Sequence, residues 1–242
     1  MKISKFLALF FIFVGLSVLS QVNDAGVWVS GSVSARVSHK IEISAAPEFR
    51  LNENFSQLQS AFIDLGGQYK LTKQFFINFT QRIGTRSNDQ FFEMRNRSQL
   101  GLGYKFEIKD FDLVLQTRLQ ALISNVRVET DPDLKSTLRS KIQVKYSGVK
   151  KFQFTGAYEV FQNASLYGEM GWTNWRAAFQ VERKYKKINF FSLGYIIQKD
   201  LASNIPETDY IVTLGYKREL DFRKNKKSKE VGPKLSSEPK TK

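Results

Sequence analysis

Apolar and polar side chains alternate along several stretches of this chain. In residues 111–120, Phe111, Leu113, Leu115 and Leu119 occupy one parity, and mostly polar side chains occupy the other. This period of two is typical of β-strands with one apolar face, and no stretch shows a convincing helical period. The same alternation recurs in residues 41–51, 75–82, 139–146, 175–182 and 210–217. The pattern therefore predicts an all-β protein.

The connections between these stretches alternate in length. Short connections are expected near residues 37–40, 71–74, 107–110, 147–151 and 185–187. Longer polar connections, rich in turn-forming Asn, Asp, Gly and Pro, are expected near 52–59, 83–92, 123–136, 162–170 and 199–208. Short turns at one end and longer loops at the other are typical of an up-and-down membrane barrel.

A tyrosine recurs on the apolar parity just before each lysine-rich short turn, and a phenylalanine follows the turn. A phenol at the end of an apolar face can keep its ring in hydrocarbon and its hydroxyl among lipid headgroups. We therefore predict a membrane girdle made of Tyr69, Tyr104, Tyr146, Tyr185 and Tyr216.

Alternation alone does not decide which face points outward. In a soluble barrel or sandwich the apolar face is the core, whereas in a membrane barrel it faces lipid. Long strands, the recurring tyrosine and polar faces rich in Arg and Gln favour lipid. The predicted fold is a single antiparallel up-and-down transmembrane β-barrel of about 10–12 strands.

The number of strands is less well determined. Residues 39–222 accommodate ten strands that begin and end on the short-turn side, and bacterial single-chain barrels have even strand numbers. Residues 27–35 form an eleventh alternating run. This run is either an extra strand or a segment in the lumen or at the rim, and the even-number rule favours ten wall strands.

The two ends of the chain predict export and a polar tail. Lys2 and Lys5 precede an uncharged run that ends in small residues, which is typical of a secretory signal peptide. The expected organisation is a signal peptide at 1–20, an N-terminal segment at 21–38, the barrel at 39–222 and a disordered basic tail at 223–242. The chain has no cysteine, which excludes a lipoprotein anchor, disulfides and thiolate metal sites.

Several runs resemble the domain-of-unknown-function 2490 family. They are EISAAPEFRLNEN (42–54), FIDLGGQYKLTKQFFINFTQRI (62–83), EMRNRSQLGLGYKF (93–106), LVLQTRLQ (113–120) and LGYKREL (214–220). The resemblance covers most of residues 26–222 and implies an exported outer-membrane β-barrel of a Gram-negative bacterium. It implies no activity and no functional residues.

The polar parity of the predicted strands carries thirteen charged side chains that would face the lumen. They are Glu42, Glu48, Arg50, Asp64, Arg82, Arg95, Arg97, Arg118, Arg139, Lys141, Glu159, Arg176 and Glu182. Such charges must pair or stay hydrated, so they form either an Arg–carboxylate lattice that closes the barrel or an anion-preferring passage. Unpaired arginines such as Arg95 and Arg97 would favour the passage.

The sequence carries no convincing catalytic constellation, cofactor motif or metal-ligand spacing. The only histidine, His39, lies in a predicted short turn, and its neighbour Ser38 would point to the opposite face. We therefore expect a non-enzymatic outer-membrane protein: a structural envelope protein or a narrow, anion-preferring pore. An outer-membrane lipid-modifying enzyme and a soluble periplasmic barrel that binds a lipophilic ligand are the alternatives.

The formal net charge of +14 predicts acidic partners. Outer-membrane lipid is expected around the barrel. The basic tail would contact barrel-assembly machinery or periplasmic anionic polymers, and an exported chain is not expected to bind nucleic acid.

Overall fold

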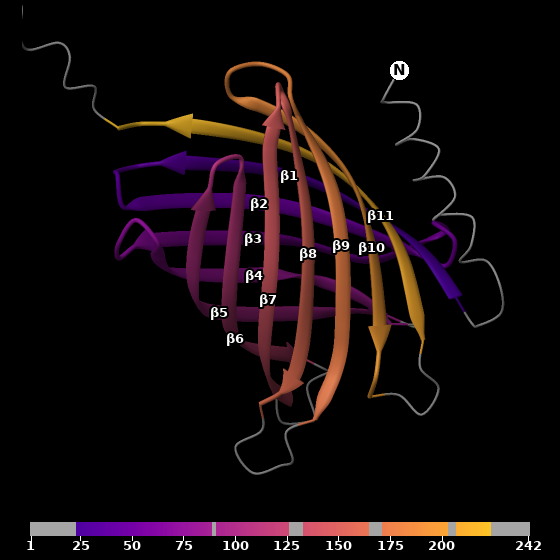
Figure 1. Cartoon of the computed structure of the whole chain (residues 1–242). Helices are drawn as coiled ribbons and strands as arrows, with labels where there is room; N and C mark the ends of the chain where they lie inside the picture. Colours follow the sequence, from indigo (N-terminus) through magenta and orange to yellow (C-terminus); the bar gives the residue numbers. More distant parts are fainter. Residues whose placement is uncertain (1–22, 89–90, 126–132, 165–170, 203–206, 224–242) are drawn as a thin grey trace, which may run out of the picture.

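The chain folds into a barrel of β-strands. The computed structural model describes residues 23–88, 91–125, 133–164, 171–202 and 207–223 (Figure 1). The predicted signal peptide and residues 224–242 of the predicted tail lie outside the described residues. Among the described residues, no helix is long and apolar enough to cross a membrane.

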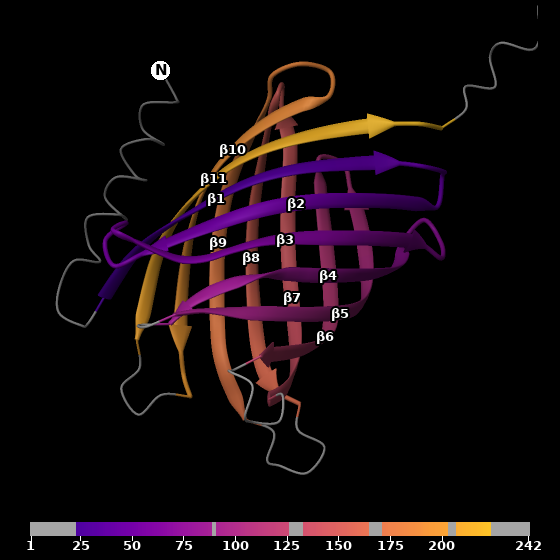
Figure 2. The ribbon, with the colours of Figure 1, turned by 180° about the vertical axis from the view of Figure 1, so that it is seen from behind.

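In the described residues, eleven strands form one closed, mostly antiparallel up-and-down barrel, which confirms the predicted all-β up-and-down barrel. The strands of opposite walls run at a steep angle to each other (Figures 1 and 2), as expected for the strand tilt that closure requires. The strands are β1 (Asn23–Arg36), β2 (Ile41–Asn52), β3 (Gln57–Lys70), β4 (Phe75–Asn88), β5 (Phe91–Ile108), β6 (Phe111–Asn125), β7 (Asp133–Val149), β8 (Phe152–Asn163), β9 (Trp172–Lys184), β10 (Asn189–Asp200) and β11 (Thr208–Asp221).

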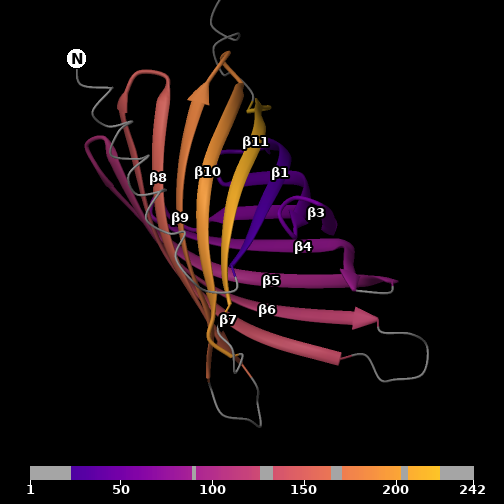
Figure 3. The ribbon, with the colours of Figure 1, turned by 90° about the vertical axis from the view of Figure 1, so that its right-hand side faces the viewer.

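The preference for ten wall strands was wrong. The alternating run 27–35 is part of β1, which pairs with β2 on one side and closes the barrel against β11 on the other (Figure 3). Because the number of strands is odd, the β1–β11 pairing is parallel. The even-number rule misled the count because it assumes an antiparallel seam, in which the chain enters and leaves the barrel at the same mouth.

The two ends of the barrel differ in their connections. One end, called here the short-turn mouth, carries the connections 37–40, 71–74, 109–110, 150–151 and 185–188. The other, the long-loop mouth, carries 53–56, 89–90, 126–132, 164–171 and 201–207. The long loops predicted near 52–59 and 83–92 were wrong, because strands β2 to β5 extend into both ranges and leave only 53–56 and 89–90 between them.

The first two short turns share one local structure. The Ser38 side chain accepts hydrogen bonds from the backbone N–H groups of Lys40 (3.2 Å) and Ile41 (3.0 Å). Thr72 accepts equivalent bonds from Gln74 (3.1 Å) and Phe75 (2.9 Å). A hydroxyl that accepts hydrogen bonds from two backbone amides stabilises the turn, which accounts for the Ser or Thr at this position in both turns.

The apolar side chains point outward and the polar ones inward. On β5, Leu100 and Leu102 are 57% and 62% exposed, whereas Gln99 between them is 4% exposed. Ala35 and Ile211 are the only buried apolar residues among those described, and no large side chain there is fully buried. The described barrel therefore has no apolar core, and its wall is held by backbone pairing and by polar contacts in the lumen.

The five repeated tyrosines all lie at the short-turn mouth on the outward parity. The repeat follows from strand register: the phenylalanine that opens one strand lies beside the tyrosine that ends the next. Phe75 and Tyr104 pair with ring centroids 4.6 Å apart, and Phe111 and Tyr146 pair at 4.7 Å. Nearer the long-loop mouth, Tyr158 stacks on Trp175 at 6.0 Å. Aromatic side chains therefore flank the apolar band at both ends.

Candidate functional site

In the described structure, charged side chains from many strands converge in the lumen. All thirteen charged residues predicted to face the lumen lie on the inward parity of their strands. Eleven of them line three cavities inside the barrel; the other two, Glu42 and Glu182, lie nearer the short-turn mouth.

Glu159 on β8 is the centre of the largest ionic cluster. Its carboxylate accepts hydrogen bonds from Arg118 on β6 (2.5 Å) and from Arg139 on β7 (2.9 Å). Arg176 on β9 approaches it to 4.0 Å, and Arg139 also donates to Gln120 at 3.2 Å. Because only 6% of the Glu159 side chain is exposed, this carboxylate binds neighbouring strands together in a place with little water.

Two more arginines are fixed on the opposite wall. Arg82 on β4 donates two hydrogen bonds to Asp64 on β3, each 2.6 Å long, and its guanidinium lies 3.3 Å from the Phe62 ring centroid. Arg50 on β2 donates to Glu48 at 2.7 Å. A bidentate carboxylate contact combined with an aromatic face holds a guanidinium in one orientation.

Trp28 is a lumen residue that the sequence analysis missed. It lies on the inward parity of β1, with the Arg50 guanidinium 3.7 Å and the Arg176 guanidinium 5.1 Å from its ring. The alternation of residues 27–35 places Trp28 on the polar parity, so treating that run as a wall strand would have found it.

Arg95 and Arg97 do not form the unpaired ladder that the sequence suggested. Arg95 donates to Glu93, two residues earlier on β5, at 2.8 Å, so the prediction was wrong for Arg95. Arg97 makes no hydrogen bond or ion pair within the described part of the chain, and its buried Nε atom has no acceptor. Among charged groups, Arg82, Arg139 and Arg50 act on it most strongly and repel it, whereas Asp64 attracts it more weakly.

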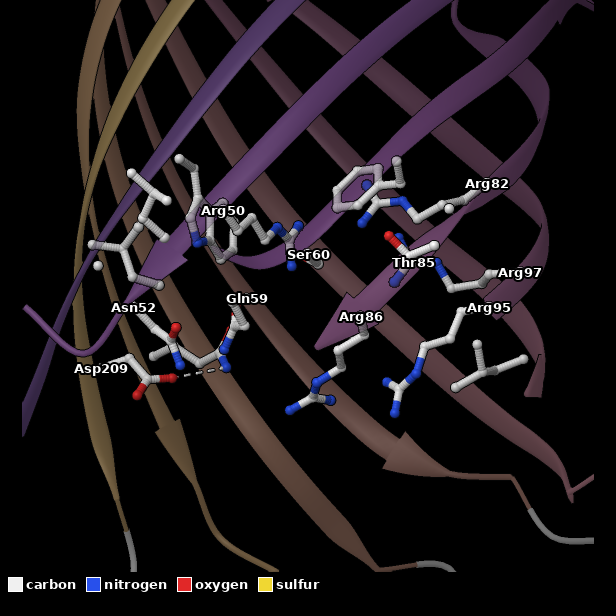
Figure 4. A pocket seen from close by; sticks show the side chains of 18 of the residues that line it. Arg50, Asn52, Gln59, Ser60, Arg82, Thr85, Arg86, Arg95, Arg97 and Asp209 are labelled. Carbon is white, nitrogen blue, oxygen red and sulfur yellow. Dashed lines mark hydrogen bonds between the residues drawn. The ribbon is translucent and has the colours of Figure 1, made fainter. Parts of the chain in front are cut away.

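The three cavities follow one another along the lumen, with volumes of about 230, 410 and 440 Å³. The first opens near the long-loop mouth, where Arg86 and Arg95 line it together with Asp209. Figure 4 shows arginines of β2, β4 and β5 pointing into it. The third extends toward the short-turn mouth past Lys141. Trp28 and Arg176 line all three, so the cavities approach one another beside this pair.

Charges near the short-turn mouth pair in a more exposed setting. Lys217 lies 3.0 Å from both Glu182 and Glu219, and Lys105 lies 2.6 Å from Glu107. Glu42 approaches Arg36 to 3.6 Å.

His39 lies in the exposed turn between β1 and β2 and lines none of the three cavities. The oxygen of Ser38 is engaged by two turn amides, as described above. Within the described ranges, no group of three or more His, Asp or Glu side chains is arranged to hold a metal ion.

Comparison with known proteins places the chain in a family. The model of the family described as "Protein of unknown function (DUF2490)" matches residues 25–208, and the chain belongs to this family. No curated protein matches the chain. The matched range begins within β1, so nearly all of this strand lies in the region that the family model covers, whereas β11 begins at the last matched residue.

Proposed function

We propose that this member of the DUF2490 family is a non-enzymatic outer-membrane β-barrel whose lumen is a narrow, anion-preferring passage. The observation that carries the proposal is the orientation of the wall, with apolar side chains outward and an excess of basic side chains inward. Each part of the proposal has its own support and its own test.

The outward apolar band supports a lipid environment. Large side chains on successive strands are exposed together, among them Ile63, Phe79, Leu100, Leu119 and Leu193. Soluble monomers rarely expose a continuous apolar surface of this kind. The strands contain 12 to 18 residues, enough for the roughly 9–11 residues that a tilted strand needs to cross the hydrocarbon core.

The lining of the cavities argues against the soluble alternative. A barrel that carries a lipophilic ligand needs a mainly apolar cavity, whereas charged and amide side chains line each of these cavities beside apolar ones such as Phe62, Phe161 and Ile196. The lipid-modifying alternative has less support, since the outer end of the barrel offers no histidine in the described residues.

Membrane location can be tested by gel migration and fractionation. A folded membrane barrel should migrate differently in detergent gels with and without boiling, and should sediment with outer-membrane vesicles. Release of the protein in the osmotic-shock fraction, with no heat-dependent shift, would contradict the proposal.

The passage can be tested in planar bilayers under a KCl gradient. We expect a small conductance whose reversal potential indicates preference for chloride. Lys141→Glu, which reverses a charge that lines the third cavity, should weaken that preference. Lys73→Glu in an exposed short turn makes the same change in net charge and should have little effect. A folded barrel that carries no current would leave the structural envelope role, with the lumen ion pairs acting only as braces.

The parallel seam supports one further expectation about orientation. Residue 23 begins β1 at the long-loop mouth, while residue 221 ends β11 at the short-turn mouth. With short turns in the periplasm, as in other bacterial barrels, an epitope inserted before β1 should be reached by antibody on intact cells. An epitope after residue 223 should be reached only after the outer membrane is opened, and the reverse result would invert the orientation. With the expected result, the proposed acidic partners of the tail would be periplasmic.

A further inference from the structure

We infer that the middle of the lumen is a binding site for a tetrahedral oxyanion, such as phosphate or the phosphoryl group of a small solute, with Arg97 as its principal ligand. The inference deepens the proposed passage and rests on it for access, but the site itself is argued from the lumen geometry alone.

The central cavity concentrates positive charge. Six arginines line its volume of about 410 Å³, against two lining carboxylates, Glu48 and Asp64, and the nearby Glu159. The six are Arg50, Arg82, Arg97, Arg118, Arg139 and Arg176. Even with Glu159 included, six positive charges face three negative ones. An uncompensated excess of positive charge in a narrow space is costly, so the site should draw in an anion.

Five of the six arginines are already held in place. Glu159 holds Arg118 and Arg139, Asp64 holds Arg82, and Glu48 holds Arg50. The Arg176 guanidinium donates to Gln198 at 2.5 Å and lies over Trp28. These side chains are therefore preorganised, and an incoming anion does not have to order them.

Arg97 differs from the other five. It lines both the first and the central cavity, and no carboxylate or aromatic ring in the described residues engages its guanidinium. A guanidinium offers several N–H donors in one plane, an arrangement that suits the oxygens of phosphate or sulfate. The side chains of Thr80, Thr137 and Asn174 line the same cavity and can donate further hydrogen bonds.

The approach to the site is also basic. Arg86 and Arg95 line the first cavity, between the long-loop mouth and Arg97 (Figure 4). Arg95 is neutralised by Glu93, so it can guide an anion but holds it less firmly than Arg97. On the far side, Lys141 lines the third cavity.

Trp28 offers a direct optical readout, because it lies 3.7 Å from the Arg50 guanidinium at the site. In a Trp172→Phe, Trp175→Phe background, Trp28 is the only tryptophan left in the chain. Inorganic phosphate titrated into the folded protein in detergent should change Trp28 emission saturably, and added NaCl should weaken the response.

Two variants with the same change in net charge test the assignment. Arg97→Gln should raise the dissociation constant for phosphate about tenfold or more, because a charge-assisted contact is lost. Arg95→Gln should raise it by no more than about threefold, because it removes an arginine that is already paired. Arg97→Lys should recover part of the affinity. Heat-dependent gel migration checks that each variant is folded.

The outcomes separate this inference from the proposed passage. Equal losses in Arg97→Gln and Arg95→Gln would overturn a site centred on Arg97. Absence of saturable binding in a folded barrel that conducts chloride would overturn the site and leave the passage. Saturable, Arg97-dependent binding in a barrel that carries no current would support the site and overturn the passage.

Discussion

The middle of the lumen and the short-turn mouth both carry many charges, but they use them differently. In the middle the cations are arginines, each fixed by a buried or half-buried carboxylate, an amide or an aromatic ring, apart from Arg97. At the short-turn mouth they are mainly lysines, such as Lys105 and Lys217, which pair with partly exposed carboxylates.

The difference follows from the local solvent. A guanidinium is weakly hydrated and can donate hydrogen bonds to two partners at once. It therefore suits a narrow interior in which hydrogen-bond geometry is restricted. An ammonium group is strongly hydrated and gains little from a fixed partner at a wet rim. Removing a charge should therefore lower the free energy of unfolding strongly in the middle of this barrel and hardly at all at the short-turn mouth.

Removal of the Glu159 charge should have the largest effect. Glu159→Gln leaves Arg118, Arg139 and Arg176 without their shared carboxylate, and we expect a loss of about 3–5 kcal/mol in the free energy of unfolding. Urea unfolding in lipid vesicles would measure it. Glu107→Gln at the short-turn mouth is the matched control, since it removes the same charge from an exposed side chain. If the losses in the two variants differ by less than about 1 kcal/mol, the distinction between the middle of the lumen and the short-turn mouth is wrong.

An arginine placed on the outward face should come next, and its cost should depend on depth. Leu100→Arg, near the centre of β5, should destabilise the barrel in lipid by about 2–4 kcal/mol, because the charge faces hydrocarbon. Phe106→Arg, on the same face near the short-turn mouth, should cost about 1 kcal/mol or less. Equal and small costs for both substitutions would show that water, and not lipid, surrounds the wall.

Loss of a girdle tyrosine should have a smaller effect. Tyr104→Ala removes the ring that contacts Phe75 at 4.6 Å, and we expect a cost of about 0.5–1.5 kcal/mol beyond the lost area. Tyr104→Phe keeps the ring and should recover most of the stability. If the Phe variant is as unstable as the Ala variant, the hydroxyl and not the ring pair is what matters at this position.

The smallest effect is expected for a rim lysine. Lys105→Gln breaks contacts to Glu107 and Asp112, yet it should cost less than about 1 kcal/mol, since the partners are partly exposed. The cost should vanish when unfolding is measured near 1 M salt, where screening acts over about 3 Å. The Glu159→Gln effect should persist at that salt concentration, and a cost of Lys105→Gln that also persists would remove the distinction between middle and mouth.

Strand alternation was enough to predict which side chains face the lumen. Once Leu113, Leu115 and Leu119 are assigned to the outside, Arg118 must point inward, and the same holds on every strand. This is why all thirteen predicted charges share the inward parity.

The partners of those charges were beyond the reach of the sequence. Arg118 reaches Glu159 across β7, and this contact depends on the stagger of three strands. Glu93 was missed as the partner of Arg95 because residues 83–92 were expected to be loop, so the strand around Glu93 was cut short. Strand β1 was visible as the alternating run at residues 27–35, but only the strand pairing could show that it closes the barrel wall.

Closure of the barrel between its first and last strands also constrains how it can be assembled. The N-terminal strand, β1, is synthesised first, yet its full-length neighbour is the C-terminal strand. Its pairing with β2 is interrupted opposite Pro47, which has no N–H to donate, whereas its pairing with β11 is continuous from residue 23 to residue 36. Until β11 arrives, one edge of β1 therefore presents unsatisfied amides, a template that any other extended chain could occupy. During folding, that edge of β1 therefore has to be covered until β11 pairs with it.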